Sequence, residues 1–358
     1  MAGPSPTPRT DPLPADLGAI AGRVERRVEA LLDEEQRRWS VLDPVLAEPI
    51  VALRSFVMAG GKRLRPAFCH LGFVGAGGDP ADPAIVDAGA AFELLQGFAL
   101  IHDDVMDGSA VRRCAPAVHR QFGDRHQAAH WTGEDRRFGE GVAILVGDLA
   151  IVYADRVLPP GPVELSRLWD ELRTELNIGQ YLDLLGTATG GVDRTGARRI
   201  ARYKSGKYTI ERPLQLGATL AGRPDLIEPL SRYGEPLGEA FQLRDDILGV
   251  WGDVERTGKP VGDDLREGKP TLLLAVAHER AGDTQRRLLG RVGEADLSPD
   301  VIADLQACLV STGALAEAEA EIATLAERAI RGLDEVPVTS EARAALRDLG
   351  AFVVARDA

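Results

Sequence analysis

Apolar side chains recur at spacings of three and four along most of this chain, and charged side chains fill the positions between them. That period is typical of one face of an α-helix. Helices are therefore predicted over residues 17–42, 49–59, 82–107, 141–157, 166–185, 272–290 and 298–333, with a last short helix after a proline-containing break near residue 336. No alternating apolar and polar stretch recurs, so the pattern predicts an all-α protein.

Two segments depart from the helical pattern. Residues 1–16 hold five prolines and few large apolar side chains, which predicts a disordered N-terminal tail. Residues 124–140 are polar and are expected to form a loop, with His119, His126 and His130 at the surface.

The helix predicted over residues 82–107 carries the first candidate site. Three carboxylates stand at its end: Asp103, Asp104 and Asp107. Asp103 and Asp107 lie one helical turn apart on the same face, where like charges repel each other. A divalent cation that prefers oxygen ligands, such as Mg²⁺, turns this repulsion into attraction. For this motif alone, a solvated acidic turn is the alternative.

A second acidic motif occurs far downstream. Asp245 and Asp246 stand in another apolar helical frame, as the first aspartates do. Two such pairs are expected to form facing walls of one metal–diphosphate site.

A basic cluster precedes both acidic motifs. Two glycines follow the predicted helix over residues 49–59, and Lys62, Arg63 and Arg65 come directly after them. Glycines allow the backbone to approach a ligand closely, and basic side chains bind phosphate oxygens. For this cluster alone, a basic helix end stabilised by the helix dipole is the alternative.

Taken together, the basic cluster and the two aspartate motifs resemble those of the trans-prenyl diphosphate synthases (polyprenyl synthetases), and geranylgeranyl diphosphate synthase-like members in particular. The likeness runs in consistent order from about residue 50 to residue 275. It implies an all-α fold of the isoprenoid synthase type, with residues 17–358 forming a single large helical bundle around a central active-site cavity. It further implies condensation of isopentenyl diphosphate with dimethylallyl, geranyl or farnesyl diphosphate, Mg²⁺ as cofactor (three ions with substrate bound) and a homodimer.

The resemblance also carries residue roles, position by position. Metal binding is implied for Asp103, Asp104, Asp107, Asp245 and Asp246. Isopentenyl diphosphate binding is implied for Lys62, Arg65, Gln96 and Arg113. Allylic diphosphate binding is implied for Arg112, Lys204, Ser205, Gln242, Lys259 and Lys269. The implied catalytic set is Asp103, Asp104, Asp107, Asp245 and Lys204.

Some positions depart from the pattern of the family. Gly249 stands where the second motif usually has a third carboxylate, and Cys114 stands where a glycine is usual. Lys207 is an additional cation without an implied role. Gly206 inside a helix costs about 1 kcal/mol relative to Ala, so a local break that exposes backbone groups is expected beside Lys204.

Product length is predicted from the residues upstream of Asp103. The resemblance implies that an aromatic at Phe98 followed by a small residue at Ala99 stops elongation at twenty carbons, which favours geranylgeranyl diphosphate; farnesyl and longer products remain alternatives. In an ideal helix, however, Ala99, Leu95 and Phe92 lie nearer to the face of Asp103 than Phe98 does. Phe92 is therefore the alternative floor of the product channel.

Composition limits the partners and the compartment. The formal net charge of −13 argues against nucleic acid as a partner, and local cations must therefore attract any diphosphate. The three cysteines are unclustered, which fits a reducing cytoplasm rather than a disulfide framework or a zinc site. No uncharged apolar run reaches the length of about 18 residues needed for a transmembrane segment, and no signal-peptide pattern opens the chain.

Two other functional classes share part of this pattern. In a class I terpene cyclase the spacing of Asp245, Gly249 and Asp253 would match the second metal motif, but the middle hydroxyl is missing and Lys62 and Arg65 would have no second diphosphate to bind. A non-catalytic partner subunit should lose aspartates from the first motif, whereas this chain keeps all three. The pattern therefore favours a chain-elongating prenyltransferase.

Overall fold

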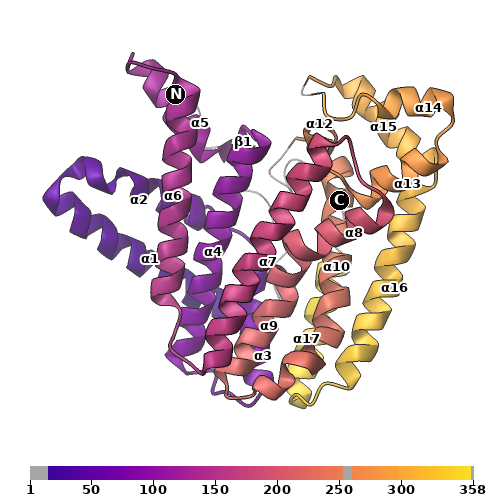
Figure 1. The fold of residues 1–358 in the computed structure, drawn as a ribbon. Coiled ribbons are helices and arrows are strands. Elements are labelled where there is room, and N and C mark those ends of the chain that lie inside the picture. Colours follow the sequence, from indigo (N-terminus) through magenta and orange to yellow (C-terminus); the bar gives the residue numbers. More distant parts are fainter. Residues whose placement is uncertain (1–14, 253–259, 295, 356–358) are drawn as a thin grey trace. The chain divides into compact units, whose positions relative to one another are not determined.

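The computed structural model describes residues 15–252, 260–294 and 296–355, and the structural statements below refer to them. Within these residues the chain is almost entirely helical (Figure 1). The two strands described there, β1 (Val111–Arg112) and β2 (Ala115–Pro116), form a short antiparallel hairpin. The predicted all-α class is confirmed.

The helices fall into two compact units. The first consists of Met1–His70 and Pro80–Pro160, and the second of Leu71–Asp79 and Gly161–Ala358. The first predicted helix begins at Ala15, two residues earlier than expected, and residues 1–14 of the predicted disordered tail lie outside the described residues. The assignment of residues 17–358 to one domain remains a prediction.

The first unit is organised around one buried helix. Its elements are α1 (Ala15–Leu42), η1 (Pro44–Ala47), α2 (Glu48–Met58), the start of α3 (Leu64–Gly75), α4 (Pro83–Asp107), the β1–β2 hairpin, α5 (Val118–Ala128) and α6 (Asp135–Val157). Helix α4 lies alongside α6, where Gly147 leaves room for the His102 ring, because a Cβ at Gly147 would come within 2.3 Å of it. On its other sides α4 packs on α1 and α2.

Both ends of α4 are set by local chemistry. The Asp82 side chain accepts a hydrogen bond from the backbone N–H of Ala84, and Pro83 stands in the first turn. Gly108 takes a left-handed conformation with φ of 68°, which stops the helix directly after Asp107. The first acidic motif therefore occupies the last turn of a fixed core helix.

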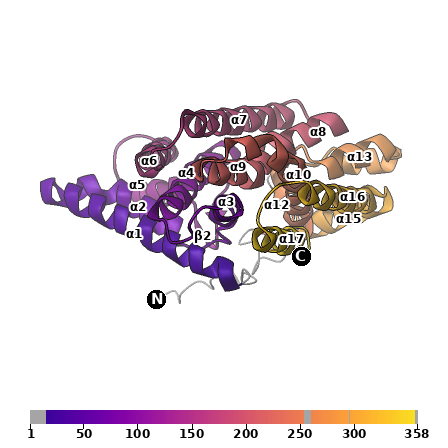
Figure 2. The same ribbon diagram turned by 90° about the horizontal axis from the view of Figure 1, so that it is seen from below.

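The second unit contains the remaining helices. These are α7 (Val163–Ala188), α8 (Arg194–Ile200), the π-helix η2 (Ala201–Glu211), α9 (Arg212–Leu220), η3 (Pro224–Leu226), α10 (Ile227–Trp251), α12 (Asp263–Glu267), α13 (Leu272–Arg280), α14 (Asp283–Leu289), α15 (Pro299–Ser311), α16 (Ala314–Asp334) and α17 (Ser340–Val354). Helix α10 is the central one, with α16 and α17 beside it (Figure 2).

Some sequence predictions about local structure are wrong. The polar stretch 124–140 is not a loop, because α5 continues to Ala128 and α6 begins at Asp135. His119 and His126 are buried, and only His130 of the three histidines is exposed. For His126 the reason is an aromatic contact: the centre of its ring lies 5.8 Å from that of Trp131 and 5.2 Å from that of Phe138.

Two predicted long helices are each divided. The segment 272–290 bends between α13 and α14, and the segment 298–333 is interrupted at Gly313, whose φ is 75°. A glycine in that conformation ends one helix and starts the next, which the apolar period alone does not reveal.

Among the described helices, α4 is long and apolar enough to cross a membrane, and α15 with α16 passes the same test only as a pair bent by 61°. In α4, 61% of the apolar window is buried inside the protein. Such burial is typical of a core helix.

Candidate active site

The acidic end of α4 is held by an arginine from the adjacent hairpin. Arg112 of β1 donates to Asp104 Oδ1 through Nε at 2.8 Å, and its Nη2 lies 3.2 Å from Asp103 Oδ2. Asp103 and Asp104 are buried, so water screens their negative charges little and they attract cations more strongly than exposed carboxylates do. The structure thus brings Arg112 and these aspartates together.

The hairpin explains the unusual Cys114. Val111 pairs with Pro116 and Arg112 with Ala115, which leaves Arg113 and Cys114 as the two turn residues. Their φ angles are 53° and 60°, the left-handed conformation that a two-residue hairpin turn of this type requires. A glycine adopts this conformation without strain, whereas a cysteine adopts it at some cost in free energy. Cys114 in place of the usual glycine therefore makes the turn less favourable but leaves its conformation the same.

Arg113 is half-buried and lies in a strongly cationic environment. Its Nη1 donates to the Phe56 carbonyl at 3.1 Å, and its guanidinium stands over the Phe56 ring. Burial lowers the pKa of Arg113 to about 10, and the positive charges of Arg63, Arg112 and Arg65 act in the same direction against Glu93. Cations crowded in this way are stabilised when an anion binds among them.

The glycine-rich turn before α3 reaches the same cluster. Gly60 and Gly61 have φ angles of 97° and 143°, and a Cβ at Gly61 would lie 3.3 Å from the guanidinium of Arg113. Lys62 and Arg65 are both half-buried. The predicted isopentenyl-diphosphate residues Lys62, Arg65 and Arg113 therefore belong to one region of the first unit, and Gln96 is half-buried on α4 two turns before Asp103.

Arg63 has a different role from its neighbours. It is buried with φ of 46°, forms ion pairs with Glu93 and Glu25, and donates to the Val57 carbonyl at 2.9 Å. Its charge is neutralised inside the unit, so Arg63 fixes the turn that carries Lys62 and Arg65.

The second acidic motif stands near the end of α10. Asp245 is exposed, whereas Asp246 is buried and accepts a hydrogen bond from Gln242 Nε2 at 2.7 Å. Burial raises the pKa of Asp246 to about 8, and the nearby charge of Asp264 acts in the same direction. Lys269 lies beside this group, with its Nζ 3.2 Å from Asp264 Oδ1. Carboxylates forced together in this way form an environment that favours a cation.

The segment with Lys204 and Ser205 is a π-helix rather than a break. The chain does not leave the helix at Gly206 as predicted; it widens into π-helical turns over Ala201–Glu211. Such turns are frequent at functional sites. Lys204 Nζ lies 2.5 Å from Asp183 Oδ2 of α7, and Ser205 is half-buried.

One face of α7 is shaped to receive this π-helix. Glu175, Gly179 and Asp183 follow one another at a spacing of four and therefore share a face. A Cβ at Gly179 would come within 2.3 Å of the Lys204 backbone nitrogen, so only glycine allows the two backbones to meet. The carboxylates on either side of Gly179 bind lysines of the π-helix.

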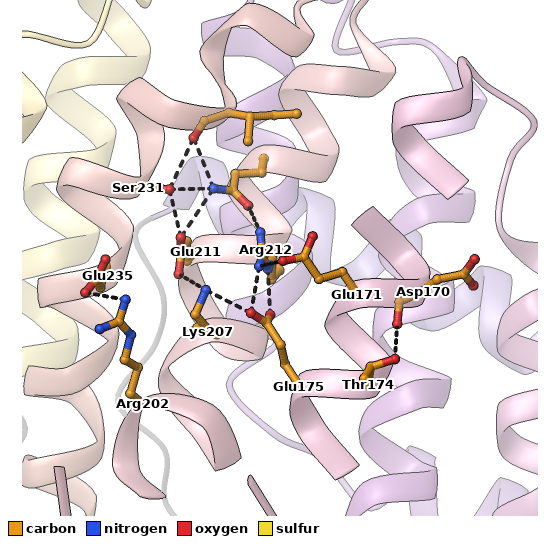
Figure 3. A network of polar contacts seen from close by, with 12 residues as sticks. Asp170, Glu171, Thr174, Glu175, Arg202, Lys207, Glu211, Arg212, Ser231 and Glu235 are labelled. Carbon is orange, nitrogen blue, oxygen red and sulfur yellow. Dashed lines mark hydrogen bonds and ion pairs between the residues drawn. The ribbon is translucent and has the colours of Figure 1, made fainter. Parts of the chain in front are cut away.

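Figure 3 shows the polar network at the Glu175 end. Lys207 Nζ lies 3.0 Å from Glu175 and 3.3 Å from Glu211, and Arg212 donates to Glu175 at 2.8 Å. Lys207 is thus a buried structural cation. This network was not predicted from the sequence, although charged residues at positions 175, 207, 211 and 212 within apolar helical frames were a signal for it.

The donor sets fit Mg²⁺ in one particular way. Carboxylate oxygens are the ligands that Mg²⁺ prefers, and Mg²⁺ commonly takes one or two of them together with phosphate oxygens and water. Within the described parts of the chain, no group of three or more His, Cys, Asp or Glu side chains is arranged to enclose an ion. The aspartates at the end of α4 therefore suit an ion shared with a bound diphosphate, and so, taken separately, do those on α10. Lys259, assigned to the allylic diphosphate, lies outside the described residues.

Comparison with known proteins agrees with this chemistry. Residues 48–309 match the family model described as polyprenyl synthetase. A geranylfarnesyl diphosphate synthase from Aeropyrum pernix is 35% identical over 316 residues, covering 84% of this chain and 92% of the relative. A geranylgeranyl diphosphate synthase from Methanosarcina mazei is 34% identical over 266 residues, covering 70% and 76%.

Solved structures extend the likeness to the fold. The crystal structure of geranylgeranyl pyrophosphate synthase from Corynebacterium glutamicum, complexed with isoprenyl diphosphate and magnesium, matches with a TM-score of 0.91 at 38% identity, covering 95% of this chain and 99% of that one. The predicted isoprenoid synthase fold is confirmed. The chain belongs to the polyprenyl synthetase family and is a trans-prenyl diphosphate synthase.

Proposed function

We propose that this synthase condenses isopentenyl diphosphate with allylic diphosphates to give geranylgeranyl diphosphate. The observation that carries this proposal is the pairing of a half-buried cationic cluster with a carboxylate-rich helix end in the first unit. Two diphosphates need separate cationic contacts, whereas a terpene cyclase binds only one.

The cations divide between the two substrates. Lys62, Arg65 and Arg113, with Gln96, bind isopentenyl diphosphate, because they gather around the glycine turn before α3. Arg112, Lys204, Ser205, Gln242, Lys259 and Lys269 bind the allylic diphosphate. Arg112 and Lys204 each contact an aspartate, which positions their cationic groups, and they can exchange part of this contact for phosphate oxygens.

The reaction is an ionisation followed by carbon–carbon bond formation. The bond between the allylic carbon and the diphosphate oxygen breaks, and Arg112, Lys204 and Lys259 stabilise the charge that develops on the leaving group. Mg²⁺ held by Asp103, Asp104, Asp107, Asp245 and Asp246 would add Lewis-acid stabilisation of the same charge. The double bond of isopentenyl diphosphate attacks the allylic cation, and the released diphosphate takes the proton that is lost. The catalytic set is Asp103, Asp104, Asp107, Asp245 and Lys204.

The proposed product length rests on α4 and on relatives. The Phe98 ring is half-buried and lies 4.7 Å from the His102 ring, whereas Phe92, further from Asp103, is fully buried. Relatives of this chain include synthases of geranylgeranyl, farnesyl, geranylfarnesyl and nonaprenyl diphosphate. The similarity to the Corynebacterium glutamicum enzyme supports twenty carbons. Phe98 closes the product channel and so limits the length of the growing prenyl chain. Ala99 and Leu95 line the channel, and Phe92, further from Asp103, closes it when Phe98 is absent.

The finer features of the assembly follow the same proposal. The enzyme is a cytoplasmic homodimer that uses three Mg²⁺ ions when substrate is bound. Exposed apolar side chains support the dimer: Ile178, Tyr181 and Leu185 share one face of α7 and are 50%, 63% and 44% exposed. On α6, Leu145 and Val152 are 60% and 56% exposed.

The division of cations is tested by steady-state kinetics with both substrates varied. Arg65→Ala should raise the KM for isopentenyl diphosphate more than that for the allylic primer, and Lys259→Ala should do the reverse. The exposed Arg136→Ala serves as the control and should leave both constants unchanged. Equal effects of Arg65→Ala and Lys259→Ala on both substrates would contradict the division.

A further inference from the structure

The place of the missing third carboxylate in the second motif is already filled. Gly249 lies one turn after Asp245 on α10, on the same helix face. A Cβ at Gly249 would come within 1.9 Å of Asp264 Oδ2 and 2.3 Å of Asp264 Cγ. The Asp264 carboxylate therefore occupies the space that a side chain at position 249 would take. A side chain at position 249 therefore fits only if Asp264 moves.

Asp264 is brought to this place by its own short helix. Helix α12 runs from Asp263 to Glu267 between Gly262 and Gly268, whose φ angles are 72° and 68°. Of the two adjacent aspartates, Asp264 is buried and Asp263 is half-exposed. The backbone N–H of Lys269 donates to the Asp264 carbonyl at 3.0 Å, which fixes the residue that carries this carboxylate.

We propose that Asp264 supplies the third carboxylate of the second acidic motif in place of residue 249, and that it contributes to holding the magnesium–diphosphate complex. This inference rests on the proposed function. The chemistry is the same as that of an aspartate at position 249: a hard oxygen donor and a negative charge one turn from Asp245, delivered by α12 instead of α10.

A purely structural role for Asp264 is the competing account. Lys269 Nζ lies 3.2 Å from Asp264 and 2.8 Å from Glu267, so Asp264 could serve only to neutralise this lysine. The two accounts differ in one respect. A structural partner of Lys269 needs only a hydrogen-bond acceptor in this place, whereas a member of the acidic motif needs the negative charge, which either helix can deliver.

A reciprocal exchange tests this difference. The proteins are the wild type, Gly249→Asp, Asp264→Ala and the double variant Gly249→Asp/Asp264→Ala. Calorimetric titration measures the Mg²⁺-dependent affinity for inorganic diphosphate, and thermal denaturation without ligand checks folding. Asp264→Ala should weaken the affinity about tenfold or more. The double variant should recover most of that loss, while Gly249→Asp alone should melt at lower temperature because its side chain meets Asp264.

Two further variants separate the charge of Asp264 from its structural contact. Asp264→Asn preserves the shape and a hydrogen-bond acceptor for Lys269 but removes the charge, and it should bind as weakly as Asp264→Ala. Asp263→Asn is the control on the same helix and should bind as the wild type does. Wild-type affinity in Asp264→Asn, or a folded double variant no tighter than Asp264→Ala, would overturn the inference. If Asp245→Asn also kept wild-type affinity, the proposed function itself would fail.

Discussion

At the residue scale, the decisive side chains are the buried aspartates at the end of α4. Asp103→Asn or Asp104→Asn keeps the volume of the side chain and its contact with Arg112 but removes one negative charge. We expect kcat to fall about 10²–10⁴-fold with the melting temperature nearly unchanged, because charge stabilisation at the leaving group is lost. Initial rates over a Mg²⁺ series check this, with the exposed Asp124→Asn as control. Near-normal turnover of either variant, or full activity in excess chelator, would contradict the role of these residues.

Product length is also decided by single residues. Phe98→Ala should open the channel and shift the product to twenty-five carbons or longer, since each buried CH₂ contributes about 0.8 kcal/mol. Phe92→Ala should act only when Phe98 is already removed. Mass analysis of the products checks both. An unchanged product in Phe98→Ala with a longer one in Phe92→Ala would place the floor at the deeper ring.

At the element scale, the π-helix η2 depends on the close approach of glycines. Gly179 meets Lys204, and a Cβ at Gly238 of α10 would lie 2.5 Å from the Gly206 carbonyl. Gly179→Ala should therefore displace Lys204, lowering kcat and raising the KM for the allylic primer. Gly141→Ala on α6 is the matched control, because nothing lies within 4 Å of its Cβ, and it should stabilise the helix by about 0.5–1 kcal/mol. Normal kinetics in Gly179→Ala would show that the close approach of Gly179 to the Lys204 backbone is not needed to position Lys204.

Local signals predicted most helices and some of their ends. The helix predicted over residues 82–107 matches α4, which Asp82 caps, and the apolar period gave the span of α1 to within two residues. These local signals do not predict contacts between residues that are distant in the sequence. The burial of His126 by Phe138, the π-helical turns over Ala201–Glu211 and the filling of position 249 by Asp264 each depend on a tertiary contact.

At the scale of the whole molecule, acid stability should depend on the network in Figure 3. Burial raises the pKa of Glu175, but hydrogen bonds and charge from Arg212 and Lys207 more than offset this, so the pKa lies below its ordinary value of 4.5. A carboxyl with a lowered pKa stabilises the fold above that value and loses the contribution as the pH falls further. Glu175→Gln should lower the melting temperature at pH 7 and flatten its decline below pH 4.5.

The matched control for acid stability is Glu327→Gln, since the Glu327 side chain is 76% exposed. It should keep the pH dependence of the wild type. An unchanged acid profile in Glu175→Gln would mean that the network contributes nothing to stability in that range.

The assembly is tested at the same scale. Tyr181→Glu places a charge on the exposed apolar face of α7, and analytical ultracentrifugation should show a monomer where the wild type sediments as a dimer. Thr174, on the same helix, is already polar, so Thr174→Glu is the control and should leave the dimer intact. A wild-type protein that sediments as a monomer would contradict the proposed interface.

The most direct test of the account is mass analysis of the products formed from isopentenyl diphosphate with each allylic primer in the presence of Mg²⁺. The account predicts condensation with dimethylallyl, geranyl and farnesyl diphosphates, ending at an all-trans twenty-carbon diphosphate. A cyclised hydrocarbon without consumption of isopentenyl diphosphate, or no product from any primer, would contradict it.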